Sequence, residues 1–102
     1  MKKSDEQIFI GIWKVARKEA KKASQTTTQD KLFSKGGIVI DDKRKKFTKW
    51  IIQAKKGIET NNGVYISGGG GQWYSQASAY ADAFCKTLKR FGIACKNDVG
   101  LD

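Results

Sequence analysis

The sequence predicts a small α+β domain in which N-terminal and C-terminal amphipathic helices pack on a small, mostly antiparallel sheet. Apolar residues recur at helical spacing over residues 5–23 and 75–91. Short apolar runs bounded by turn residues, at 37–41 and 63–67, predict strands. The chain of 102 residues is long enough for one domain with one modest core, and its 39% hydrophobic content is too high for a wholly disordered protein.

The first predicted helix covers residues 5–23. Ser4 is suited to cap its start, and the acidic residues that follow suit the positive end of a helix. At about 100° per residue the apolar side chains share one broad face, and basic side chains occupy the opposite one. The basic positions are Lys14, Arg17, Lys18, Lys21 and Lys22.

The second predicted helix covers residues 75–91. Ser75 is expected to cap it, and Gly92 followed by Ile93 is typical of a helix end. Residues 93–102 are expected to fray, as chain ends commonly do.

Residues 43–56 fit both a strand and a middle helix. The residue types around Phe47 and Trp50 favour a strand, which a hairpin turn at 41–44 would introduce. The spacing of Phe47, Trp50 and Ile51 favours a helix, which an aspartate at 41 or 42 would cap and Gly57 would end. Periodicity and composition disagree, so both alternatives stay open.

Three further segments are predicted to be loops or turns. Residues 24–35 are polar and aperiodic, and Asn61-Asn62-Gly63 is typical of a tight turn. The glycine run 68–71 leads into Trp73 and the last helix. Bare backbone amides at such a helix start could hold a phosphate, and Trp73 could stack on a base.

Cys85 and Cys95 are the only cysteines. Their spacing is not Cys-x-x-Cys, and the chain has no histidine to complete a metal site with them. A disulfide could close around the end of the last helix. The absence of an export signal after the first residues nevertheless favours a cytoplasmic protein with two reduced, partly buried thiols.

The charge balance predicts a polyanionic partner. Lys and Arg total 20 against 10 acidic residues, giving a formal net charge of +10. So strong a field on a small domain favours nucleic acid, DNA or RNA, or an acidic protein surface. The excess is densest in residues 31–56, which hold nine bases and two acids.

We therefore expect phosphates to be bound mainly by a central cluster, defined as Lys43, Arg44, Lys45, Lys46, Lys49, Lys55 and Lys56. Arg17, Lys18 and Lys21 would widen this footprint, and Trp73 is a candidate stacking residue. Phe47 and Trp50 lie among these cations, where they are expected in the core more often than at the surface.

The predicted function is non-enzymatic nucleic-acid binding. Without histidine the chain lacks the commonest general base and metal ligand, so we predict no catalytic residue, metal, cofactor or small-molecule substrate. No apolar run approaches the roughly 20 residues that cross a bilayer, so no membrane partner is expected.

Two alternatives remain. The first is a small basic interaction or inhibitor protein, such as one encoded by a phage or mobile element, that docks on an acidic surface of a larger nucleic-acid-processing enzyme. The second, which the residues favour less, is a toxin ribonuclease that works without histidine.

The predicted order of strand, basic turn, strand, strand and helix over residues 37–92 resembles three-strand-plus-helix DNA-binding domains of the AP2 and integrase-arm type. The similar residues are Gly37-Ile38-Val39, Asp42-Lys43-Arg44-Lys45-Lys46, Ala79-Tyr80-Ala81 and Phe91-Gly92. The resemblance covers about half the chain, and no functional residue is carried over from it.

Overall fold

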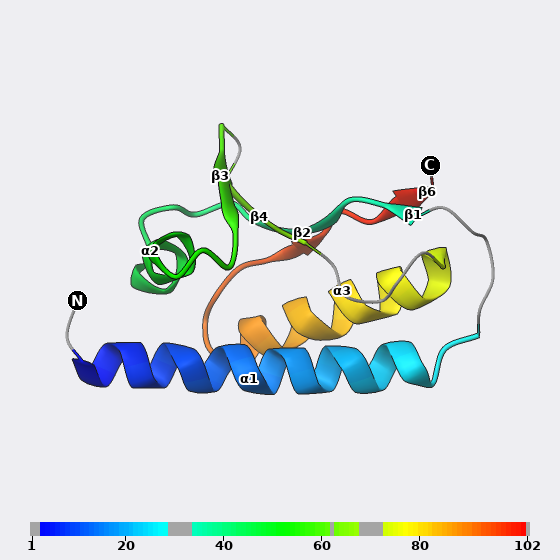
Figure 1. Ribbon diagram of the computed structural model, residues 1–102, viewed down its shortest axis with the longest axis horizontal. Coiled ribbons are helices and arrows are strands. Elements are labelled where there is room, and N and C mark those ends of the chain that lie inside the picture. Colours follow the sequence, from blue (N-terminus) through cyan, green and yellow to red (C-terminus); the bar gives the residue numbers. More distant parts are fainter. Residues whose placement is uncertain (1–2, 29–33, 62, 68–72, 102) are drawn as a thin grey trace.

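The computed structural model describes residues 3–28, 34–61, 63–67 and 73–101. Three helices and a four-stranded antiparallel sheet confirm the predicted α+β class (Figure 1). The elements in chain order are α1 (Lys3–Gln25), β1 (Ser34–Lys35), β2 (Gly37–Ile40), α2 (Lys46–Gln53), β3 (Ile58–Thr60), β4 (Gly63–Ser67), α3 (Tyr74–Arg90), β5 (Lys96–Asn97) and β6 (Gly100–Leu101).

The four-stranded sheet has the order β3-β4-β2-β5, and all of its pairs are antiparallel. In the central pair Ile38 lies opposite Ile66 and Ile40 opposite Val64, and all four side chains are buried. The alternate residues Val39 and Tyr65 are partly exposed, as the period of two in a strand requires. The two predicted strands are thus confirmed, with one face of the sheet turned to the core.

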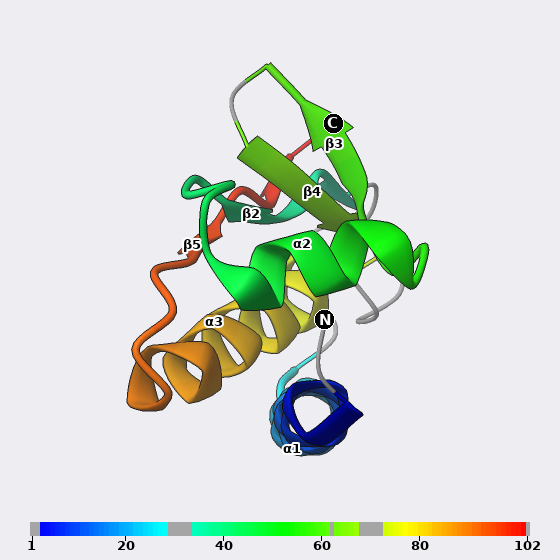
Figure 2. The ribbon, with the colours of Figure 1, turned by 90° about the vertical axis from the view of Figure 1, so that its left-hand side faces the viewer.

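The helices lie on that buried side of the sheet, as two perpendicular views show (Figures 1 and 2). α1 and α3 run antiparallel and side by side, and Ala16 and Ala20 of α1 are fully buried. Side chains this small let the two helices approach closely. No helix in the described ranges is both long enough and apolar enough to cross a membrane.

Residues 43–56, whose sequence fitted both a strand and a helix, contain the short helix α2. Phe47, Trp50 and Ile51 are buried, so the periodicity predicted this element correctly and the residue types did not. The ring of Phe9 in α1 lies 5.6 Å from Phe47 and 6.1 Å from Trp50 between centroids. These aromatic contacts hold α2 against α1.

The predicted ends of the helices need correction. α1 begins at Lys3 and α3 is preceded by Trp73 as its N-cap residue, so the predicted caps Ser4 and Ser75 lie inside helices. α2 has Lys45 in the N-cap position without a side-chain cap, and it ends at Gln53 rather than at the predicted glycine.

The polar stretch expected to be a loop over 24–35 is shorter than predicted. α1 extends to Gln25, and Ser34 and Lys35 form β1. Residues 29–33 lie outside the described residues.

The predicted end of α3 is confirmed. Gly92 adopts a left-handed backbone with φ of 77°, and the Ile93 N–H donates to the Leu88 carbonyl at 3.0 Å. The Gly92 N–H donates to the Lys89 carbonyl, which completes a Schellman motif.

The C-terminal segment does not fray over its described residues, contrary to the sequence prediction. β5 pairs with β2, and β6 pairs with β1. The Asn97 side-chain amide donates to Ser78 Oγ at 3.0 Å and to Asp82 Oδ1 at 2.8 Å, so the segment is also bound to α3.

Cys85 and Cys95 form a disulfide, with their Cα atoms 5.1 Å apart, so the expectation of two reduced thiols is wrong. The pairing of β5 with β2 returns the chain to α3 and brings Cys95 beside Cys85. Both residues are buried at the boundary between the helices and the sheet.

Reduction of this disulfide is expected to destabilise the fold. The two residues are 10 positions apart, and cross-linking so short a loop contributes about 2–3 kcal/mol in the chain-entropy account. Urea unfolding with and without dithiothreitol measures this difference. A Cys85→Ser, Cys95→Ser double variant is the control, because reductant should leave its unfolding free energy unchanged. Equal stability of the oxidised and reduced wild-type chains would contradict the prediction.

Candidate nucleic-acid interface

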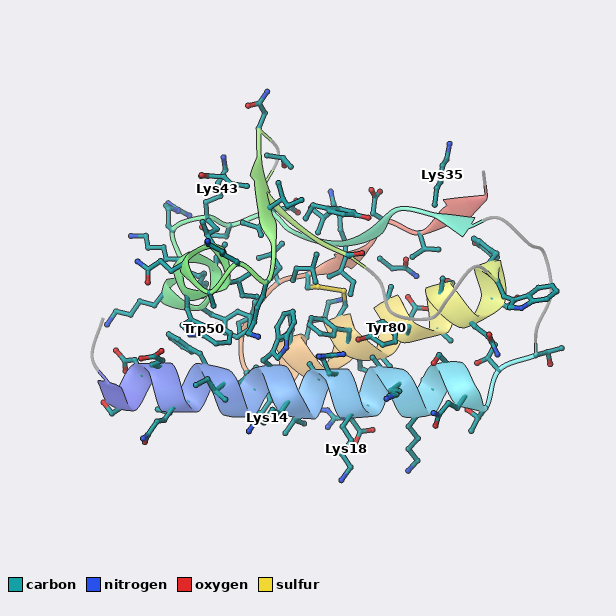
Figure 3. All side chains as sticks on the ribbon, viewed as in Figure 1. Lys14, Lys18, Lys35, Lys43, Trp50 and Tyr80 are labelled. Atoms are coloured by element: carbon teal, nitrogen blue, oxygen red, sulfur yellow. A yellow bond between two sulfur atoms is a disulfide. The ribbon has the colours of Figure 1, made fainter. Side chains whose placement is uncertain are left out.

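Four cations form a stripe along one flank of α1. Lys14, Arg17, Lys18 and Lys21 are three or four positions apart, so they neighbour one another on the helix surface. All four side chains are exposed, because the opposite side of α1 carries the buried Ala16 and packs on α3. Lys14 and Lys18 project from the side of α1 that faces away from the sheet (Figure 3).

A fifth cation reaches this flank from the end of α2. The Lys56 ammonium lies 5.2 Å from the centroid of the Trp13 ring and 6.0 Å from that of Trp50. Both distances are within the range of a cation–π interaction. Trp13 lies on α1 immediately before the cation stripe, so Lys56 and the stripe are neighbours.

The backbone at the end of α2 directs Lys56 to this place. The Lys56 N–H donates to the Ile51 carbonyl at 3.0 Å, and the Lys55 N–H donates to the Ile52 carbonyl at 3.1 Å. This is again a Schellman motif, but its left-handed residue is Lys55, with φ of 58°, rather than glycine. The side chain after that turn is therefore placed by hydrogen bonds in the backbone.

The five cations surround a hollow with an aromatic floor, which we call the basic groove. Its volume is about 420 Å³, and an adjoining hollow of about 210 Å³ extends it to Ser67 of β4. None of its described lining residues is acidic, and none of its cations forms an ion pair with a described carboxylate. The groove is lined by Lys14, Arg17, Lys18, Lys21, Lys56, Trp13 and Tyr80.

The indole of Trp13 is held in place by other rings. Its centroid lies 5.3 Å from that of Phe84 and 6.4 Å from that of Trp50, both with edge-type geometry. Its Nε1–H is buried and has no hydrogen-bond acceptor among the residues that the structure describes. A buried donor without a partner is costly to the fold.

The structure divides the central cluster predicted from the sequence. Three of its cations have partners among the described residues. Lys43 donates to the Thr60 carbonyl at 2.7 Å and lies 3.7 Å from Glu59. Arg44 pairs with Asp42 at 3.2 Å, and Lys46 lies 3.8 Å from Asp5. These contacts are largely exposed and individually weak, but they offset part of the charge.

The other members of the central cluster have no such partner in the described ranges. Lys45, Lys49 and Lys55 are exposed without an ion pair there, and Lys56 belongs to the basic groove. The run of bases at 43–46 precedes and begins α2, so it does not form the hairpin turn of the strand alternative.

The predicted aromatic residues do not form a stacking surface within the central cluster. Phe47 and Trp50 are buried, which confirms the core assignment and excludes both rings as an exposed stacking surface. Trp73 is half-buried at the start of α3, the end of that helix remote from α2, so it does not join the central cluster (Figure 1). The glycine run 68–71 lies outside the described residues.

Sequence reasoning missed Trp13, Lys14 and Tyr80 as site residues. Lys14 is three and four positions before Arg17 and Lys18, which were predicted site residues, and this helical spacing could have identified it. The helical spacing of apolar residues places Trp13 and Tyr80 on the apolar faces of their helices, which is correct for most of each ring but not for the part that lines the groove.

Arg44 changes the protonation of its aspartate partner. Its guanidinium donates to Asp42 Oδ1 at 3.2 Å, and this bond, with a second from the Arg44 backbone N–H at 3.0 Å, lowers the pKa of Asp42. No group of three or more His, Cys, Asp or Glu residues gathers in the described part of the chain to hold a metal ion.

Comparison with known proteins gives no relative: no family model, no curated protein and no solved structure matches the chain. The resemblance to three-strand-plus-helix DNA-binding domains does not extend to the structure. α2 stands where that pattern needs the strand after the basic turn, and the strand neighbours β3, β4 and β2 are out of chain order.

Replacing Arg44 with alanine is expected to raise the pKa of Asp42 towards its ordinary value. Because folding lowers this pKa, the contact stabilises the fold at neutral pH and its contribution is lost as the pH falls through the Asp42 pKa. A carbon-detected NMR titration of the carboxyl group measures the change. Lys49→Ala is the matched control, since Lys49 makes no bond to Asp42. An unchanged Asp42 pKa in Arg44→Ala would refute the assignment.

Proposed function

We propose that the protein is a non-enzymatic nucleic-acid-binding protein that contacts phosphates through the basic groove. The observation that carries this proposal is the gathering of five cations from two separate segments, 14–21 and Lys56, around one hollow without a described acid. Ammonium and guanidinium groups are the usual phosphate contacts of such proteins. Groups without a local carboxylate lose less when they bind a phosphate instead.

The dimensions of the stripe suit several consecutive phosphates. Lys14 and Lys21 are seven residues apart, which is about 10 Å along a helix. A duplex strand advances about 3.4 Å per nucleotide along the duplex axis, so the stripe matches about three nucleotides of a duplex whose axis runs parallel to α1. Lys45, Lys49 and Lys55 add to the positive field that attracts the polymer.

A docking protein is the second candidate, because a separate apolar hollow of about 390 Å³ lies on the other flank of α1. Ile8 is 58% exposed and Phe91 50% exposed at this hollow, and Lys45 and Lys46 border it. An apolar surface with a cationic border suits an acidic partner protein. In that case Ile8→Ser would weaken the protein complex and leave nucleic-acid binding unchanged.

Charge reversal in the groove is expected to weaken nucleic-acid binding. In Lys18→Glu, Lys21→Glu two phosphate contacts are lost, so the slope of log affinity against log salt should fall by about two. The wild-type affinity itself should drop a few hundredfold between about 50 and 200 mM salt if all five cations contact phosphates. Fluorescence anisotropy with single-stranded and duplex DNA and RNA measures both quantities.

The control is Lys35→Glu, Lys86→Glu, which removes the same net charge from exposed residues of β1 and α3 outside the groove. Equal losses in the two double variants would show that net charge acts without the groove. Absence of binding to all four nucleic acids at low salt would overturn the proposed function. Mapping of RNA products after incubation tests the ribonuclease alternative.

A further inference from the structure

We propose that the basic groove is a site for single-stranded nucleic acid, in which one unpaired base stacks on the Trp13 ring while the phosphates lie on the cation stripe. This inference rests on the proposed function and adds the class of strand. Its basis is the combination of a cationic border with an aromatic floor, since phosphate binding alone requires only the cations.

The floor of the groove is suited to a base rather than to a phosphate. Trp13 and Tyr80 both line the hollow, and the Trp13 ring is positioned by edge contacts with Phe84 and Trp50. Every base has a flat face that can stack on an aromatic ring. In a duplex these faces are covered by neighbouring base pairs, so only an unpaired base can reach the floor.

Lys56 occupies the place that a base would take. Its ammonium lies over the Trp13 ring at 5.2 Å from the centroid, and its side chain is long and exposed. When a strand binds, a phosphate attracts this ammonium more strongly than the ring does, and the base takes its place on the ring. The indole face is therefore kept covered by a group that the ligand itself can displace.

The size of the hollow points to the same ligand. The hollow of about 420 Å³ is within the size range of sites for ligands such as a nucleotide.

An acidic protein segment accounts for less of the site. Carboxylates could pair with the five cations, but they would leave the aromatic floor without a stacking partner. The observations therefore favour a strand with bases over an acidic peptide, and the experiment includes both.

The test uses Trp13 as the single fluorescent tryptophan, in a Trp50→Phe, Trp73→Phe chain. Titration with a single-stranded oligonucleotide should quench its emission, because a stacked base contacts the indole. Inorganic polyphosphate should bind without this quenching and should compete with the oligonucleotide. A duplex of equal length should bind at least tenfold more weakly than the single strand at the same salt concentration.

A second measurement uses Trp13→Leu in the otherwise unchanged chain. Loss of one stacked base should lower single-strand affinity roughly 5- to 150-fold, while polyphosphate affinity stays the same. Phe91→Leu, at the apolar hollow on the other flank, is the matched control and should change neither affinity.

The outcomes separate the two proposals. Equal affinity for single strand and duplex without quenching of Trp13 would overturn this inference and leave the proposed function in place. Binding of polyglutamate without binding of any nucleic acid would overturn both. Quenching by the single strand alone, with polyphosphate competing, is the result that supports both.

Discussion

The rotation of α1 about its own axis governs the rest of the structure. Ala16 and Ala20 are fully buried against the other elements, which fixes the face of α1 that packs inward. At about 100° per residue, Trp13 then falls at the boundary between the buried face and solvent, and the cation stripe falls beyond it. A different rotation would bury the lysines or remove Trp13 from both the core and the groove.

Aromatic contacts between α1 and α2 hold the Lys56 side of the groove in place. Trp13 and Phe9 pack on α2 through Trp50 and Phe47, so α2 is fixed relative to α1. The Schellman motif that ends α2 then directs Lys56 to the indole. Core packing and the position of the candidate site are thus produced by one set of rings.

The sequence predicts the two long helices and the central strands because each has a strong local period. α2 was ambiguous because it has only eight residues, of types that also suit a strand, and its outcome depends on α1, some forty positions away. The paired C-terminal segment and the disulfide depend on the return of β5 to β2, which no local pattern records.

The candidate site was predictable in its charge and not in its position. The density of basic residues along the chain identified residues 43–46, but Asp5 and Glu59, from distant segments, pair with two of these cations. The spacing of the basic residues on α1 is visible in the sequence, whereas the position of Lys56 over Trp13 depends on the tertiary fold. Local spacing therefore predicts the cations on α1, whereas the packing of α2 on α1 determines where Lys56 lies.

The disulfide joins the C-terminal half of α3 to the residue just before an edge strand of the sheet. A strand at an edge has neighbours on one side only and separates from the sheet more readily than an inner one. If β5 peels away from β2, Cys95 remains tethered within a few ångströms of the helix. The strand then searches for its place in a small volume, so its return is a fast intramolecular event, and the exposed edge of β2 is open to foreign strands only briefly.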